Sequence, residues 1–552
     1  MTPSTPLPPS PLYPHDSGRP RLRVTVVLAC HALPGWLDET LAALETAPFV
    51  ELALLRSPPA PARRQGSLLW RCLYRGDRAL LGSLSSVLAP RPLRPSLAAA
   101  PLYDDGALTR AVATTTPDVL LCLGRSPAPV ALWPLARRAA WSLPAEACHA
   151  DGALLHLLPA FLRGEAGTVS GLPIHDDRAG QHLLLEPTDV SVAQLSLARN
   201  SAYQLQKAPA QLLRALRHLH RDEPLEALPV SVPRPPGRLA SLRLCLALAL
   251  RGLRRRLPRL GRIERWTLAF RRNGHPLRPE APDAHGFRCW TPPAGWFWAD
   301  PFPWSRGGED LVFFEALPYA SGVGEIHMAR IDADGQPSAP VAVIADGRHR
   351  SYPFLVEHGG EPLMLVECAE SRRLEAWRPE RWPDRWRAVA TLLEGWRIVD
   401  ATLHRHAGRW WLFACVAETP FDDGGREFNE LFLFHADDPL GPWQPHPDNP
   451  VVRGVARARP AGPLFEHGGR LIRPAQDCTL EYGHRIVFHE VLRLDETAYE
   501  ERPLGRLDPV WAPGLRGCHT YARHGRLEFL DAKFLVPSRA ARGAVPRAPG
   551  AP

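Results

Sequence analysis

GWFWADPFPWSRGGEDLVFFEALP, residues 295–318, contains the unit from which the C-terminal half of the chain is built. An apolar strand around Asp300, a glycine turn and a second strand of alternating apolar residues follow one another, which is the pattern of a β-hairpin. The unit recurs four times, after gaps of 52, 48, 62 and 58 residues. The anchors equivalent to Asp300 are Tyr352, Asp400, Gly462 and Thr520. A repeat at this period indicates a modular β architecture.

Five units of about 50 residues, each with room for four strands, match the blades of a β-propeller. A single blade cannot bury both of its faces, so the blades close radially and their innermost strands line a central channel. Stacked β-helices are the competing geometry, but their repeats are far shorter. We predict an all-β five-bladed propeller over 280–536, with its anchors converging on the axis.

The N-terminal half has a different pattern. LRVTVVLAC (22–30) and VELALL (50–55) are apolar, β-branched strand candidates, and WLDETLAALETA (36–47) between them has helical spacing. PDVLLCLG (117–124) is a further buried strand candidate. Alternating strands and helices are typical of a parallel sheet, so we predict an α/β domain over 21–228.

Pro-, Ala- and Arg-rich segments flank the two domains. We expect disordered tails at 1–20 and 537–552, and a linker at 229–279. Within the linker, 238–272 contains eleven arginines and one acid around LCLALAL. This segment is either a connector helix, which we favour, or a basic amphipathic helix that makes peripheral contact with an anionic membrane.

Composition excludes several classes of protein. The net charge is +8, but only Lys207 and Lys533 are lysines, and Arg, Ala and the 61 prolines are over-used together, as in a GC-rich genome. No basic patch is interleaved with aromatic residues, so we expect no nucleic-acid partner. The ten cysteines are scattered without a CxxC pair, which indicates buried thiols in a reducing compartment and no zinc site.

The N-terminus lacks the features of a signal peptide, and no stretch reaches the length of a membrane-spanning helix. We therefore expect a cytoplasmic protein, with a membrane-peripheral location as the alternative. No cofactor or metal is expected, and the oligomeric state is left open.

Three acids are expected on the axis. Asp300 and Asp400 hold equivalent positions in blades one and three, and Glu367 ends the second strand of blade two. Glycosidic bond cleavage needs one ionised and one protonated carboxyl group flanking the bond, and a third can tune their pKa values. We predict Asp300 as base or nucleophile, Asp400 as orienting acid and Glu367 as proton donor. The structural alternative is that each aspartate belongs to a turn or strand end.

Other residues near these anchors suit sugar binding. An indole can stack on a sugar ring, an arginine can clamp a phosphate or carboxylate, and a histidine can bind a hydroxyl. The predicted substrate-binding residues are Trp298, Tyr352, Arg473, Gln476, Asp477 and His519.

The propeller motifs resemble known families. ADP at 299–301, Asp400 and HT at 519–520 are similar to the five-bladed propellers of glycoside hydrolase family 43. WFWADPF with FFE, LVEC, DAT, LIRPAQD, Tyr482-Gly483 and HTY more specifically resemble the N-terminal propeller of glucosamine inositolphosphorylceramide transferase and its bacterial relatives. The resemblance covers about 250 residues and implies a carbohydrate-active propeller.

The N-terminal domain resembles the formyltransferase fold that accompanies this propeller in bacterial proteins. PDVLLCLG and the helical ending with Asn200 and Lys207 carry the likeness. Active formyltransferases place an Asn-x-His pair before an SLLP segment; here HLLP begins at His156 and position 154 is leucine. The resemblance implies a degenerate domain.

These inferences give one functional hypothesis and two alternatives. The favoured reading is an enzyme acting on a glycan, glycoconjugate or sugar nucleotide, glycosidase-like or glycosyl-transferring, in cell-envelope polysaccharide metabolism. The first alternative is a non-catalytic carbohydrate-binding or scaffold protein. The second is a sugar N-formyltransferase that works through the N-terminal domain.

Overall fold

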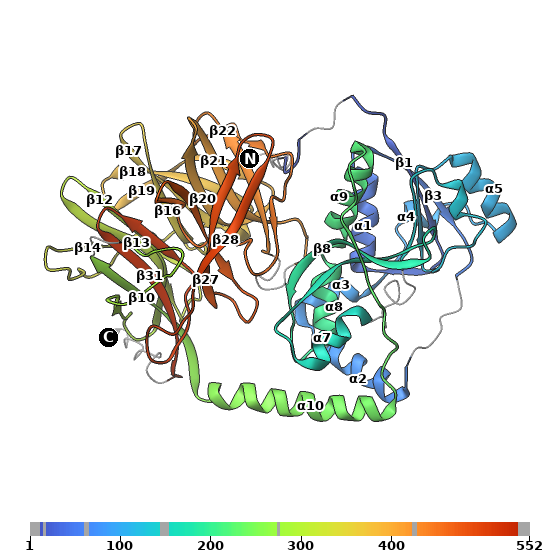
Figure 1. Cartoon of the computed structure of the whole chain (residues 1–552), viewed down its shortest axis with the longest axis horizontal. Coiled ribbons are helices and arrows are strands. Elements are labelled where there is room, and N and C mark those ends of the chain that lie inside the picture. The colour runs from blue at the N-terminus through green and yellow to red at the C-terminus, as the bar shows by residue number, and fades with distance from the viewer. Residues whose placement is uncertain are drawn as a thin grey trace, which may run out of the picture. The chain divides into compact units, whose positions relative to one another are not determined.

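The computed structural model describes residues 11–14, 18–59, 66–143, 154–272, 276–421 and 428–538. The chain divides into two compact units (Figure 1). The first, the α/β unit, comprises His15–Arg254 and Glu418–Glu427. The second, the propeller unit, comprises Met1–Pro14, Arg255–Ala417 and Phe428–Pro552.

The α/β unit is organised around a seven-stranded sheet with the order β3-β1-β5-β6-β7-β8-β9. Its first four strands are mutually parallel, and the last three join as antiparallel neighbours. The strands are β1 (Leu22–Leu28), β3 (Val50–Arg56), β5 (Val119–Leu123), β6 (Ala139–Leu143), β7 (Gly167–Asp176), β8 (Gln181–Ser191) and β9 (Ala227–Pro229). The predicted α/β sheet is confirmed, and its likeness to formyltransferases stays a prediction.

Helices pack against this sheet and supply much of the core. Trp36 and Leu41 of α1 are fully buried, and α9 presents Leu212 and Leu216 to the same cluster. The longer helices are α1 (Gly35–Thr46), α2 (Leu68–Ala79), α5 (Asp105–Thr115), α8 (Leu197–Leu205), α9 (Ala208–Arg221) and α10 (Arg238–Arg256). None of the helices among the described residues has the length and hydropathy needed to cross a membrane.

The propeller unit contains five antiparallel sheets, which are its five blades (Figure 1). The predicted five-bladed propeller is confirmed. Blade one is β12 (Trp296–Arg306), β13 (Glu309–Pro318), β14 (Glu325–Ile331) and β15 (Val341–Ile344). Blade two is β16 (Ser351–His358), β17 (Glu361–Cys368), β18 (Arg373–Arg381) and β19 (Arg385–Glu394). Blade three is β20 (Arg397–His406), β21 (Arg409–Ala417), β22 (Glu430–Ala436), β23 (Gln444–Pro445) and β24 (Val452–Arg453). Blade four is β25 (Phe465–His467), β26 (Arg470–Asp477), β27 (Arg485–Leu494) and β28 (Tyr499–Leu507).

The fifth blade joins the two ends of the propeller sequence. Its inner strands are β29 (Leu515–Gly517), β30 (Tyr521–His524) and β31 (Leu527–Pro537), and its outer strands are β10 (Arg262–Arg272) and β11 (Arg288–Trp290). β10 pairs with β31 along its whole length. The propeller thus begins at β10, inside the segment 229–279 that we expected to be a linker. This strand was not predicted because the arginines at both ends of RIERWTLAFRR hide the strand pattern of its buried centre.

The innermost strands are interrupted at the predicted anchors. In blades one to three the register shifts between Ala299 and Phe302, Ser351 and Phe354, and Val399 and Thr402. The anchors at these bulges are Asp300, Tyr352 and Asp400, with φ angles of 50°, 47° and 54°. Bulges with left-handed residues are costly for non-glycine side chains and concentrate at functional sites.

The fourth anchor, Gly462, shows why the backbone is constrained here. Its φ is 117°, and a Cβ on it would lie 2.0 Å from the carbonyl oxygen of Tyr521. Only glycine fits between neighbouring inner strands at this point.

Part of the predicted N-terminal tail is ordered against the propeller. Leu12 is 3 % exposed, and its carbonyl accepts a hydrogen bond from Asn449 Nδ2 at 3.0 Å. Tyr13 contacts the ring of Phe432. The apolar PLY segment therefore packs rather than remaining disordered, while 1–10, 15–17 and 539–552 lie outside the described residues.

The ring closure predicts where a stable propeller fragment begins. We expect residues 255–538 to fold cooperatively and residues 280–538 to aggregate. Loss of β10 exposes the edge of β31 and the buried Leu527 and Phe529, which pack in one cluster with residues of β10. Thermal melting followed by circular dichroism, with size-exclusion chromatography, measures both. Equal melting temperatures for the two fragments would contradict this closure.

Candidate functional site

Five buried carboxyl groups surround the propeller anchors. Asp300 and Asp400 come from the inner-strand bulges of blades one and three, and Glu367 comes from the end of β17. Glu315 on β13 and Asp531 on β31 complete the set. Each is less than 10 % exposed. Sequence reasoning found the first three acids and missed Glu315 and Asp531.

A signal for Glu315 was present in the repeat. Glu315 pairs with Ala299, and Glu367 pairs with Ser351, so each lies opposite the residue that directly precedes an anchor. FFE in blade one and LVEC in blade two are therefore the same structural position. Aligning the second strands as well as the first would have identified it.

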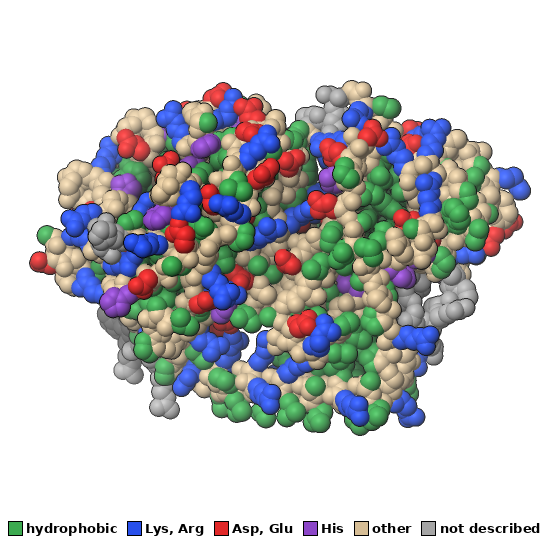
Figure 2. Space-filling view, viewed as in Figure 1, with side chains coloured by type: hydrophobic (Ala, Val, Ile, Leu, Met, Phe, Trp, Pro, Cys, Tyr) green, Lys and Arg blue, Asp and Glu red, His purple; other side chains and the backbone are tan. Residues whose placement is uncertain are grey.

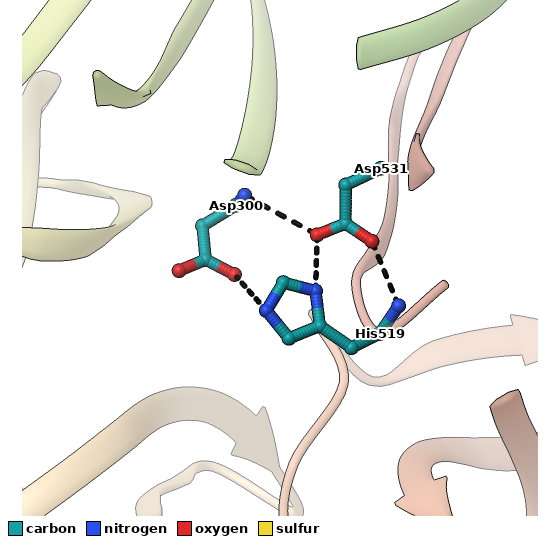
Figure 3. A group of neighbouring side chains, drawn as sticks. All are labelled: Asp300, His519 and Asp531. Carbon is teal, nitrogen blue, oxygen red and sulfur yellow. Dashed lines mark hydrogen bonds and ion pairs between the residues drawn. The ribbon is translucent and has the colours of Figure 1, made fainter. Parts of the chain in front are cut away.

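Asp531 links blade five to blade one (Figure 3). Its Oδ1 accepts hydrogen bonds from the backbone N–H groups of His519 at 2.7 Å and Thr520 at 3.1 Å. Its Oδ2 accepts the N–H of Asp300 at 3.3 Å and forms an ion pair with His519 Nδ1. One carboxylate thus orders two neighbouring inner strands.

His519 lies between two carboxylates. Its Nε2 is 3.7 Å from Asp300 Oδ1, while its Nδ1 faces Asp531 (Figure 3). The ring stacks on Trp266 at 4.2 Å between centroids and meets the edge of Tyr482. Burial lowers the pKa of His519, but the charges of Asp531 and Asp300 outweigh it and raise the pKa above the ordinary value. The protonated, positively charged form of the His519 imidazole is therefore favoured.

Asp300 is held in one orientation. Its Oδ1 accepts a hydrogen bond from Thr520 Oγ1 at 2.6 Å. Burial raises the pKa of Asp300 to about 6, with His519 opposing the rise and Asp531 and Asp400 adding to it. A carboxyl group with this pKa changes protonation state close to neutral pH.

Asp400 occupies the equivalent position in blade three. Its backbone N–H donates to Glu367 Oε2 at 2.5 Å, and its side chain forms an ion pair with Arg459. Gln476 Nε2 lies 3.5 Å from the same carboxylate. Burial raises the pKa of Asp400 to about 6, although Arg459 lowers it. Arg459 was not predicted, since nothing in RARP distinguishes it from the many other arginines.

The two glutamates differ in their hydrogen bonding. Glu367 accepts from Ser351 Oγ at 2.6 Å as well as from the Asp400 N–H, which suits an ionised acceptor, although burial raises its pKa. Glu315 lies 3.4 Å from His349 Nε2. Its burial, and then the charges of Asp300 and Glu367, raise the pKa of Glu315 well above the ordinary value. Glu315 is the better candidate for a protonated acid at neutral pH.

Tyr352 and Trp298, both predicted to bind substrate, differ in their surroundings. The Tyr352 hydroxyl lies 2.9 Å from Thr402 Oγ1 and accepts the N–H of Gly462 at 2.9 Å, so it joins blades two, three and four. Trp298 packs in an aromatic cluster with Trp290 and is 4 % exposed.

Arg473 and Asp477 are committed to other protein groups. Arg473 Nε donates to Glu501 at 2.7 Å, and its guanidinium also reaches the carbonyl of Arg457. Asp477 accepts from Arg485 Nε at 2.8 Å. Of the nine predicted site residues, the structure brings six into the axial network; Trp298, Arg473 and Asp477 contact other groups, and their substrate roles stay predictions.

One group in the described chain has the geometry of a cation site. The potential ligand atoms of Asp300, His519 and Asp531 lie within 4.8 Å of one another, and all three residues are buried. In this arrangement His519 Nδ1 already forms an ion pair with Asp531. A metal would have to displace the proton that makes His519 a cation.

A pocket of about 470 Å³ opens beside the end of β17. Cys368, the residue after Glu367, lines it, together with the loop that holds Ser371. Its charged lining is Arg348, Glu370, Arg372, Arg373 and Glu394. It lies at the same end of blade two as the axial glutamate and is of a size suited to small ligands.

In the α/β unit, two residues of the segments compared with formyltransferases, His156 and Asn200, lie in hydrogen-bond contact with other protein groups. His156 Nε2 lies 3.0 Å from Ser170 Oγ, and burial lowers the pKa of His156 to about 4. Asn200 uses both polar atoms on the backbone of Ala193, accepting its N–H at 2.6 Å and donating to its carbonyl at 3.1 Å. Formyltransferase activity stays a prediction.

Comparison with protein families identifies a match inside the propeller. Residues 291–507 match the family model described as glucosamine inositolphosphorylceramide transferase 1, N-terminal. The protein of that name from Oryza sativa subsp. japonica is 33 % identical over 224 residues, which are 39 % of this chain and 29 % of the relative. The Arabidopsis thaliana protein is 32 % identical over 208 residues, 37 % of this chain and 27 % of that one. The predicted resemblance of the propeller is confirmed, and the chain spans less than a third of these relatives' length.

The solved structures that match part of this chain include glycoside hydrolases. A GH43_1 enzyme from Xanthomonas citri is 13 % identical with a TM-score of 0.32, and the match covers 44 % of this chain and 87 % of that enzyme. An exo-β-1,3-galactanase from Phanerochaete chrysosporium is 13 % identical with a TM-score of 0.31, over 40 % of this chain and 54 % of that one.

The raised pKa values predict a pH dependence of stability. A carboxyl group whose pKa is higher folded than unfolded stabilises the fold below its unfolded pKa, and this stabilisation is lost as pH rises through the folded pKa. For Asp300 and Asp400 the unfolding free energy should therefore fall between pH 4 and pH 6, by about 3 kcal/mol for each.

Denaturant unfolding of the propeller, followed by tryptophan fluorescence, measures this slope. Asp400→Asn should reduce the dependence of the unfolding free energy on pH, because the amide does not titrate. Asp437→Asn, at a side chain that is 92 % exposed, should leave the slope unchanged. A wild-type slope unaffected by Asp400→Asn would show that this carboxyl group does not titrate near pH 6.

Proposed function

We propose that the propeller unit is carbohydrate-active and acts on a glycan or glycoconjugate, by glycosidase-like or glycosyl-transferring chemistry. The observation that carries the proposal is the pair Asp300 and Asp400. They are equivalent bulge residues, both buried, and both have pKa values raised to about 6. The class of substrate is supported by the match of 291–507 to the family described as glucosamine inositolphosphorylceramide transferase 1, N-terminal.

The proposed roles follow from the protonation states. Cleavage or transfer at a glycosidic bond needs an ionised carboxylate and a protonated carboxyl group. Asp300, oriented by Thr520 and facing the His519 cation, is the proposed base or nucleophile. Asp400, held by Arg459, orients the sugar.

Glu315 replaces Glu367 as the favoured proton donor in this proposal. Its pKa is raised well above the ordinary value, so it keeps its proton at neutral pH. Glu367 accepts two hydrogen bonds, from Ser351 and from the Asp400 N–H, and holds the bulge of blade three. An acid that only accepts hydrogen bonds is a poor donor.

A non-catalytic carbohydrate-binding or scaffold role is the second candidate. The observation that favours it is that the axial acids are buried and bonded to protein groups. Asp531 accepts three backbone N–H groups, and Asp400 is paired with Arg459. In that case the acids hold the blades together, and a ligand binds at the pocket beside Cys368.

The biological setting is part of the proposal. An envelope-polysaccharide pathway, a sugar nucleotide as donor and a cytoplasmic location rest on the composition and on the family resemblance. In this proposal the anionic donor binds in the 470 Å³ pocket beside Cys368, at Arg348 and Arg372, since the third arginine, Arg373, is paired with Glu394.

A glycan array followed by product analysis on the bound glycans tests the proposal. We expect wild type to release or transfer sugar, and Asp300→Asn and Glu315→Gln to retain binding but lose about 10²–10⁴-fold in rate, as for removal of an acid or base. Asp437→Asn is the matched surface control. Binding without turnover by wild type would favour the scaffold, and full activity in Asp300→Asn would refute the assigned site.

A further inference from the structure

Helix α10 has one face committed to the α/β unit. Leu244 is 5 % exposed and belongs to the core of that unit, with Leu248 packed against the same cluster. Ser241 is fully buried and donates to the carbonyl of Gly237. Arg251 donates to the carbonyls of Phe161 and Leu162 at 2.7 Å and 2.6 Å. These contacts fix which side of the helix faces outward.

The outward face carries a row of exposed leucines. Leucines recur at spacings of three and four residues, which places them on one side of a helix with 3.6 residues per turn. Their exposed fractions are 63 % for Leu239, 60 % for Leu242, 63 % for Leu246, 47 % for Leu250 and 55 % for Leu253. Figure 2 shows apolar side chains gathered along α10.

The five leucines lie on one helix in the α/β unit. Single exposed leucines are common on protein surfaces, but a row of five on one helix face marks an interaction surface.

Arginines border the leucine row, and no acid accompanies them. α10 contains six arginines and neither aspartate nor glutamate. At 100° per residue, Arg243 and Arg254 fall on one flank of the row and Arg238 and Arg256 on the other, and all four are exposed. An apolar face between two cationic edges requires a partner that is apolar within and anionic at its surface.

We propose that α10 docks on an anionic phospholipid membrane, lying in the interface with its leucine row inserted among the acyl chains and its arginines on the lipid headgroups. Arginines at 243, 251 and 254 within the helix favour this parallel orientation. A second copy of the chain is a poor occupant, because two such helices would bring the eight flanking arginines together without a counter-charge. The membrane surface supplies both the apolar layer and the negative charge.

This inference is independent of the proposed function. The docking surface belongs to α10, and none of the axial carboxyl groups contributes to it. Loss of membrane binding would therefore leave glycan turnover in solution unchanged.

Flotation of the whole protein with phospholipid vesicles tests the proposal. Vesicles of phosphatidylcholine with about 30 % phosphatidylserine should carry the protein, and pure phosphatidylcholine vesicles should bind at least tenfold less. The double variant Leu246→Ser/Leu253→Ser should lose most binding, and Arg243→Gln/Arg254→Gln should lose the preference for anionic lipid. Raised salt should weaken binding by wild type.

A matched control keeps the test specific. Leu480 and Leu492 of the propeller unit are 52 % and 51 % exposed, so Leu480→Ser/Leu492→Ser removes the same apolar surface elsewhere and should bind as wild type does. Circular dichroism verifies that each variant is folded. Absence of binding to anionic vesicles, or undiminished binding by the α10 leucine variant, would overturn the proposal. A concentration-dependent dimer abolished by that variant would assign the leucine row to a second copy instead.

Discussion

Hydrogen bonds from backbone N–H groups of one blade to a carboxylate of the preceding blade hold the inner strands around the axis. Asp531 accepts the N–H of Asp300, and Glu367 accepts the N–H of Asp400. The donor of each bond is a residue with positive φ, where the inner strand bulges and its N–H is not paired with the neighbouring strand. An unpaired buried N–H is costly, so these carboxylates provide the acceptors that the N–H groups at the bulges need. The same hydrogen bonds hold the acids of the candidate site in the buried centre of the propeller.

Concentrating carboxyl groups in this way has an electrostatic consequence. Five acids share a buried region with the cations Arg459 and His519. Burial penalises the ionised form of each acid, and each negative charge penalises its neighbours. The network therefore retains protons at a pH where isolated carboxyl groups would be ionised. A propeller that uses acids to join its blades has, for that reason, groups suited to proton transfer near neutral pH.

Much of this architecture was predictable, and the exceptions have physical reasons. The repeat of strand and turn residues located all five anchors, because every blade must pack against its two neighbours around the axis in the same way. β10 was missed because its partner β31 is distant in sequence and pairing between them is non-local. Trp298 was predicted to bind substrate because it lies near Asp300 in the sequence, but its ring packs against Trp290. Arg459 has no local signature, since only the fold brings it to Asp400.

The central claim is that Asp300 and Asp400 meet in one buried electrostatic network. Carbon-13 NMR of labelled aspartate carboxyl groups, titrated in wild type and in Asp400→Asn, measures this directly. The account predicts that Asp300 titrates with a pKa of about 6 in wild type and at a lower pH in Asp400→Asn, because a neighbouring negative charge has been removed. An ordinary pKa for Asp300 that is the same in both proteins would contradict it.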